Sequence, residues 1–61
     1  MKKVFVEVYY CDTHECCSQY HCWPSEVPEC GNVIDLGFGK KGKVMETAKS
    51  DIGYMVFVKE W

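Results

Sequence analysis

The residues with the most distinctive chemistry in this chain are five cysteines and two histidines, which all lie between Cys11 and Cys30. Thiolate sulfur and imidazole nitrogen are donors that zinc prefers, and a structural zinc site takes four of them in a tetrahedral arrangement. Seven donors exceed one such site. The sequence therefore leaves open a second ion, ligands from two chains, or donors that bind no metal. The candidate ligands are Cys11, His14, Cys16, Cys17, Cys22 and Cys30, with His21 as a further one.

The spacing of these donors fits a zinc site better in its first half than in its second. His14 and Cys16 follow Cys11 within the short distance that lets one turn direct two ligands at one ion. Cys30-Gly31 resembles the end of a zinc-ribbon knuckle, but Val27 stands where its first cysteine belongs. The chain therefore departs from the zinc-ribbon pattern.

Strand pairing predicts which cysteines meet. Cys11 ends the first predicted strand and Cys30 precedes the second, so pairing of these strands would bring the two thiols together. Cys16 or Cys17, together with Cys22, would then complete four ligands. Because protein donors can fill every position, we expect a closed structural site and not a catalytic one with bound water.

Disulfides and free buried thiols are the alternatives to zinc. Five is an odd number of cysteines, so at least one would stay unpaired within a monomer. Disulfides also do not persist in a reducing cytosol. We interpret the chain as complete and cytoplasmic, because Glu7 interrupts its apolar start and no cleavage site of small residues follows.

Length and composition predict one small domain over residues 1–61. A chain of 61 residues has little capacity for core burial, so a metal staple is expected. Apolar residues make up 48% of the chain, which excludes a disordered tail. All seven cationic residues are lysines and the net charge is −2. The lack of arginine weakens a nucleic-acid interpretation, because arginine provides the bidentate contacts to phosphate and guanine.

Alternating apolar residues predict the strands. Residues 3–10 place Val4, Val6 and Val8 on one face, and residues 54–60 are apolar on both faces, which indicates a central strand. Residues 32–38 form a shorter strand candidate. Glycines indicate a turn at residues 39–42, and a second turn is expected at residues 50–53. Residues 43–50 suit a helix or a strand, and we favour a strand because turns flank them.

These elements predict a small all-β or β-rich α+β domain stapled by zinc. The expected sheet has three or four antiparallel strands, with a Cys/His-rich metal loop over residues 11–30 after the first strand and hairpins over residues 32–60. The expected core consists of apolar residues from all these strands: Val4, Val6, Val8, Val33, Ile34, Leu36, Val44, Tyr54, Val56, Phe57 and Val58.

A glycine-rich segment from Gly37 to Val44 resembles the phosphate-covering hairpin of protein kinases over eight residues. No other kinase motif accompanies it, so we interpret it as a hairpin turn that carries lysines. The chain also lacks a plausible catalytic set, and a fold of this size is not expected to enclose a ligand cavity of about 300–1,000 Å³. We therefore expect a protein that is not an enzyme.

Two binding functions follow. The first is a zinc-containing mini-protein that binds a basic protein partner through aromatic anchors and acidic residues, namely Trp23, Tyr20, Trp61, Glu26 and Glu29. Its size and acidity are similar to those of small phage-encoded inhibitors of host nucleic-acid-handling enzymes, such as CRISPR nucleases, and such a protein would act in the host cytoplasm. The alternative is a zinc-ribbon-like nucleic-acid-binding or transcription-regulatory module that uses Lys40, Lys41 and Lys43. Apolar residues of the last strand also predict a homodimer that buries Met55, Phe57 or Trp61.

Overall fold

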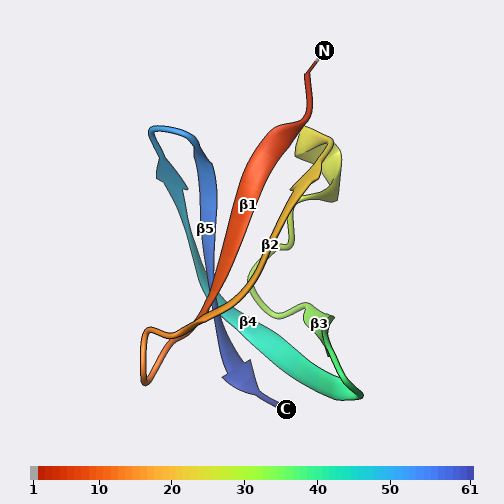
Figure 1. Cartoon of the computed structure of the whole chain (residues 1–61), viewed down its shortest axis with the longest axis vertical. Coiled ribbons are helices and arrows are strands. Elements are labelled where there is room, and N and C mark those ends of the chain that lie inside the picture. The colour runs from red at the N-terminus through yellow and green to blue at the C-terminus, as the bar shows by residue number, and fades with distance from the viewer. Residues whose placement is uncertain (1) are drawn as a thin grey trace.

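A computed structural model describes residues 2–61 and shows five strands and one short 3₁₀ helix (Figure 1). The longest strand has 11 residues, and the helix lies in the connection between the second and third strands. Their bounds are β1 Val4–Tyr10, β2 Cys16–Cys22, η1 Pro24–Glu26, β3 Val33–Gly37, β4 Lys40–Ser50 and β5 Gly53–Glu60.

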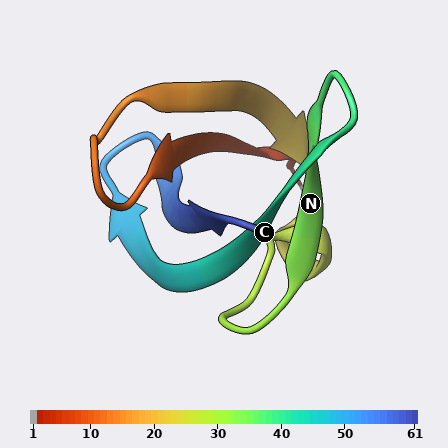
Figure 2. The ribbon, with the colours of Figure 1, turned by 90° about the horizontal axis from the view of Figure 1, so that it is seen from below.

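All five strands form one mixed sheet in the order β2-β1-β5-β4-β3. β1 and β2 form an antiparallel hairpin, and β3, β4 and β5 form an antiparallel meander. The two halves are joined by parallel pairing of β1 with β5, in which Val6 lies beside Tyr54 and Val8 beside Val56. The sheet curls into a half-barrel whose edges are β2 and β3 (Figure 2).

The small all-β class is confirmed, but two details of the predicted fold are wrong. The sheet has five strands and one parallel pair, and the segment expected to be a metal loop contains strand β2. β2 alternates sides although it is rich in cysteine. Cys22 is buried and Tyr20 packs against the core, whereas Gln19 and His21 are exposed. Because a free cysteine behaves as a small apolar residue, this segment can serve as a strand.

The turns explain most of the glycine pattern. Phe38 and Gly39 connect β3 to β4, and both have positive φ angles, 53° and 74°, as a two-residue hairpin turn requires. The predicted turn at residues 39–42 is therefore displaced, since Lys40 already belongs to β4. The strand favoured for residues 43–50 is confirmed, and so is the turn after it, where Asp51 and Ile52 join β4 to β5.

The core lies on the inner face of the curled sheet and consists mainly of valine. The buried residues are Val6, Val8, Cys22, Val44, Val56 and Val58. Val4, Ile34 and Leu36 pack against them, as predicted. Three predicted core residues are not part of this cluster. Tyr54 is only partly buried and is not among the residues packed against the valines. Val33 is 45% exposed on the edge strand β3, and Phe57 alternates with buried Val56 and Val58 and so faces outward.

In the part of the chain that the structure describes, no helix has the length and apolar character needed to cross a membrane.

Candidate functional site

The candidate zinc ligands on β2 point in different directions. Cys22 is buried in the core and Cys17 packs against the core. Cys16 is exposed, and the His21 ring lies tilted against the outward Phe5 ring, with centroids 5.1 Å apart. Burial raises the pKa of the Cys17 and Cys22 thiols above their ordinary value, with Glu26 adding to the effect at Cys22. Burial thus disfavours the thiolate form of both thiols.

Cys11 and Cys30 do not meet along the sheet. The backbone N–H of Cys11 donates to the Val58 carbonyl on β5, and the N–H of Gly31 donates to the Val44 carbonyl on β4. Val58 and Val44 are paired neighbours, so β5 and β4 lie between the two cysteines. The expected contact fails because β1 pairs with β2 and β5 and never with β3.

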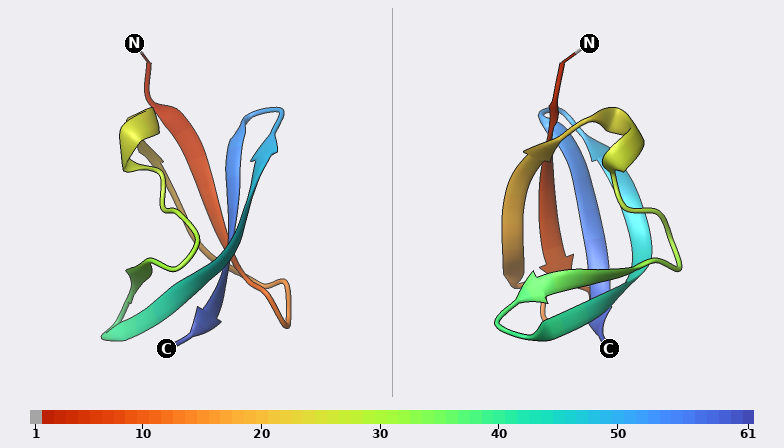
Figure 3. Two further views of the ribbon diagram at one scale, coloured as in Figure 1. Left: turned by 180° about the vertical axis from the view of Figure 1, so that it is seen from behind. Right: turned by 90° about the vertical axis from the view of Figure 1, so that its right-hand side faces the viewer.

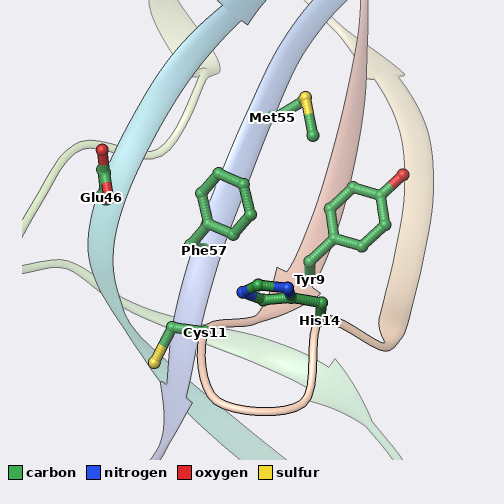
Figure 4. A pocket seen from close by; sticks show the side chains of 6 residues that line it. All are labelled: Tyr9, Cys11, His14, Glu46, Met55 and Phe57. Atoms are coloured by element: carbon green, nitrogen blue, oxygen red, sulfur yellow. The ribbon is translucent and has the colours of Figure 1, made fainter.

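Across residues 2–61, no group of three or more His, Cys, Asp and Glu side chains is arranged to hold a metal ion. Cys30 is exposed, with its sulfur 3.7 Å from the Met45 carbonyl. His14 and Cys11 line a common hollow, but the Cys11 sulfur points away from the imidazole (Figure 4). Zinc binding stays a prediction, and the geometry of β2 does not support a single four-ligand site.

The predicted partner-binding residues lie at different places. Trp23 is beside η1, where Lys3 Nζ lies 5.5 Å from its ring and its backbone N–H donates to Glu26. Trp61 follows β5 and lies at the opposite end of the molecule (Figure 1). Tyr20 packs against the core. Glu26 is the last residue of η1, and Glu29 is exposed in the loop between η1 and β3. These residues therefore do not form one surface.

The kinase-like glycines have structural roles. Gly37 and Gly39 have positive φ angles at the β3–β4 turn. Gly42 is buried, and a side chain there would press on Leu36 and Val58 at 3.0–3.1 Å. The segment is therefore the hairpin that the sequence interpretation favoured.

The side chains that do gather lie on the outer face of β1 and β5, opposite the valines. Tyr9 and Phe57 occupy paired positions on the parallel strands, and their rings stack with centroids 6.0 Å apart. His14 reaches over from the β1–β2 turn and meets Phe57 edge-on at 6.4 Å. We call Tyr9, His14, Met55 and Phe57 the outer aromatic cluster.

The outer aromatic cluster borders a hollow of about 530 Å³ that is open to solvent (Figure 4). Cys11 and Glu46 complete its lining, and Glu46 comes from β4 directly opposite Phe57. An open hollow of this size was not predicted from the sequence, where only an enclosed cavity was considered. It lies on the surface of a sheet, where it can accept a protruding side chain of a partner.

Carboxylates give this outer surface a negative character. The Tyr9 hydroxyl donates to the Glu7 carboxylate at 2.7 Å, and the Gln19 amide donates to the same oxygen at 3.5 Å. The hydrogen bond from the Tyr9 hydroxyl to Glu7 raises the pKa of Tyr9 above its ordinary value. Glu46 provides a second carboxylate on the other side of the rings, and no lysine is among the lining residues.

Beyond the hollow, the same face becomes basic toward the end of β5. Lys43 and Lys59 are paired across β4 and β5, and Lys43 Nζ lies 4.9 Å from the Trp61 ring. Lys41 lies two residues before Lys43 on the same strand, so alternation directs it to the same side. Lys40 faces the other way and shares a smaller hollow of about 220 Å³, whose lining includes Asp12, Glu15 and Glu60. The three predicted lysines are therefore divided between two faces.

Sequence reasoning missed Glu7 and Glu46 as parts of a site. Alternation in β1 offered a signal for Glu7, because Glu7 and Tyr9 lie opposite the valines. Glu46 could not be found this way. A bulge between Val44 and Glu46 shifts the register of β4 and places Glu46 opposite Phe57.

Comparison with known proteins finds no match, whether to family models, to curated protein sequences or to solved structures.

Proposed function

We propose that this protein is a non-enzymatic binding domain that docks a basic segment of a protein partner on its outer face. The observation that carries the proposal is the outer aromatic cluster, whose stacked rings border an open hollow between two carboxylates. Aromatic side chains are frequent anchors of protein interfaces, and an aromatic face attracts a cationic side chain.

The charges around the hollow support a lysine or arginine side chain as the group that enters it. Glu46 lines the hollow and Glu7 holds the Tyr9 hydroxyl, so a guanidinium or ammonium group would meet ring faces and carboxylates together. A partner with such a group would present lysine or arginine side chains on its surface, as enzymes that handle nucleic acids do. Such an enzyme is the partner class that the small size and acidity of the chain suggested.

A second candidate function is binding of single-stranded nucleic acid at the basic end of the same face. Lys43 and Lys59 lie next to Trp61, which is 69% exposed and can stack on a base. The net charge of −2 and the carboxylates beside the aromatic cluster oppose this function, because phosphate affinity depends on neutralising cations.

The test is a titration of isotope-labelled protein, followed by NMR, with a mixed-sequence peptide rich in lysine and arginine. We expect shifts at the outer aromatic cluster and at least about tenfold weaker binding for Tyr9→Ala and for Glu46→Gln. Phe38→Ala is the matched control, because Phe38 is fully exposed at the β3–β4 turn.

A single-stranded oligonucleotide at about 150 mM salt provides the opposing measurement. The protein could instead bind the oligonucleotide, lose this binding in Lys43→Ala and Lys59→Ala, and not respond to the peptide. This result would favour the nucleic-acid-binding function. Equal peptide binding by the Tyr9, Glu46 and Phe38 variants would overturn the assignment of the hollow.

A further inference from the structure

The outer edge of strand β2 is an unpaired backbone edge that lacks the usual protection. β2 pairs only with β1, and among residues 2–61 its other side has no strand partner. Its sequence, Cys-Cys-Ser-Gln-Tyr-His-Cys, contains no charge and no proline. Sheets normally protect such an edge with lysine, proline or an inward charge, because a free row of N–H and C=O groups pairs with other strands.

The other edge of the sheet is built differently. β3 has five residues, carries Asp35 at its centre and is interrupted by a bulge between Asp35 and Gly37. Two copies of β3 would bring carboxylates together, whereas two copies of β2 would not. β2 is also bulged, but only at its start near Cys16, which leaves Ser18 to Cys22 regular. Figure 3 shows β2 at the margin of the sheet, away from the loop that follows η1.

The two ends of β2 carry opposite charge. Its first end adjoins the turn where Asp12, Glu15 and Glu60 surround Lys40. Its last end, at Cys22, adjoins the start of β1, where Lys2 and Lys3 precede Val4 and Glu26 is the nearby carboxylate. The first end is therefore net negative and the second net positive.

We propose that a second copy of this chain pairs with β2 in an antiparallel, two-fold symmetric manner, giving one continuous sheet of two molecules. Antiparallel pairing places the acidic end of each β2 beside the basic end of the other, so both charge contacts are favourable at once. The two-fold axis runs perpendicular to the sheet, because the strands pair edge to edge. Both outer aromatic clusters consequently face the same side and stay accessible.

This dimer differs from the homodimer predicted from the sequence, which would bury apolar side chains of the last strand, β5. β5 is the central strand of the sheet, and its backbone is paired on both sides, with β1 and β4. β5 can therefore offer only side chains to a second molecule, whereas β2 offers a row of main-chain groups.

The first measurement is sedimentation of the full chain. We expect a species of twice the 7.1 kDa chain mass. The amides of β2 that point away from β1 are every second one between Ser18 and Cys22. In the dimer these amides should exchange slowly with solvent, and on dilution to the monomer they should exchange rapidly. A chain that stays monomeric up to about 1 mM, the weak end of the affinity scale, overturns the proposal.

A charge exchange then tests the pairing direction. Glu15→Lys and Lys3→Glu should each weaken self-association at least about tenfold, because each removes the attraction between the oppositely charged ends at both contacts. A mixture of the two variants should form a heterodimer more stable than either homodimer, because one of its two contacts keeps the parental charges. Asp51→Lys and Lys49→Glu, which make the same charge changes on β4 and the β4–β5 turn, are the matched controls, because β1 and β5 separate β4 from β2. A dimer that is unaffected by the first pair, or equally weakened by the controls, excludes pairing through β2.

Discussion

The inner and outer faces of β1 and β5 use side chains of very different size. On the inner face, Val6, Val8, Val56 and Val58 are almost completely buried. On the outer face, the larger Phe5, Tyr9, Met55 and Phe57 are only half-buried. The usual order, with the largest apolar side chains innermost, is reversed in these two strands.

Curvature provides the physical reason for this reversal. A sheet of five short strands that curls on itself leaves little volume on its concave side, and β-branched valine fills such a space in a well-defined rotamer. The convex side has no covering layer among the described residues, so its aromatic side chains contact only neighbouring side chains on the same face and stay available for a partner. Substitutions on the inner face should therefore mainly change stability, and substitutions on the outer face should mainly change binding.

The largest effect is expected where the two halves of the sheet meet. Gly53 lies opposite Phe5 at the start of the parallel β1–β5 pairing, and a side chain there would overlap the Phe5 backbone carbonyl. Gly53→Ala should lower the free energy of unfolding by about 3 kcal/mol, measured by urea denaturation.

Gly39→Ala is the control for this variant. Gly39 has a φ of 74° but no neighbouring atom within 4 Å of an added side chain. Left-handed strain alone should cost about 1–2 kcal/mol. If Gly53→Ala is no less stable than Gly39→Ala, the close β1–β5 contact is not what restricts position 53.

The next effect compares adjacent residues on opposite faces. Val56→Ala should lower the free energy of unfolding by about 2 kcal/mol, because it opens a cavity in the valine core. Phe57→Ala removes a larger but half-exposed side chain and should cost about 1 kcal/mol. Binding of the basic peptide should show the opposite order. Equal losses of stability in both variants would contradict the division between the faces.

A smaller effect is expected for the reactivity of the thiols, which differ in burial. Cys17 and Cys22 pack at the core and burial raises the pKa of both thiols, whereas Cys16 and Cys30 are exposed. Below the raised pKa values these two thiols stay protonated, so at pH 8 they should alkylate several-fold more slowly than the exposed pair. Mass spectrometry of peptides after timed iodoacetamide treatment measures this. Uniform labelling would show that β2 leaves the sheet in solution.

The smallest expected effect concerns metal removal. The predicted four-ligand site combined Cys11 and Cys30 with Cys22 and either Cys16 or Cys17, but β5 and β4 lie between Cys11 and Cys30. We therefore expect EDTA to leave the melting temperature of the reduced protein unchanged. A large drop in melting temperature, with one zinc per chain by elemental analysis, would instead support the zinc site predicted from the sequence.

The sequence by itself determined the all-β class, strands β1 and β5, and the turn between β4 and β5. Alternation around Val6 and Val56 indicated β1 and β5, and apolar residues on both faces of residues 54–60 indicated a central strand, which β5 is. The turn at residues 50–53 was likewise predicted from local composition. These features depend on neighbours within a few residues, which is why a single sequence contains them.

Only the tertiary structure decided which strands are neighbours and therefore which side chains meet. Parallel pairing of β1 with β5 joins the two ends of the chain, and no local pattern encodes it. This pairing places Tyr9 beside Phe57 and separates Cys11 from Cys30 by two strands. The arrangement of the cysteine-rich segment likewise depends on strand pairing that the sequence does not encode locally. Its donor types indicated zinc, but the backbone hydrogen bonds of β2 to β1 direct alternate donors to opposite faces of the sheet.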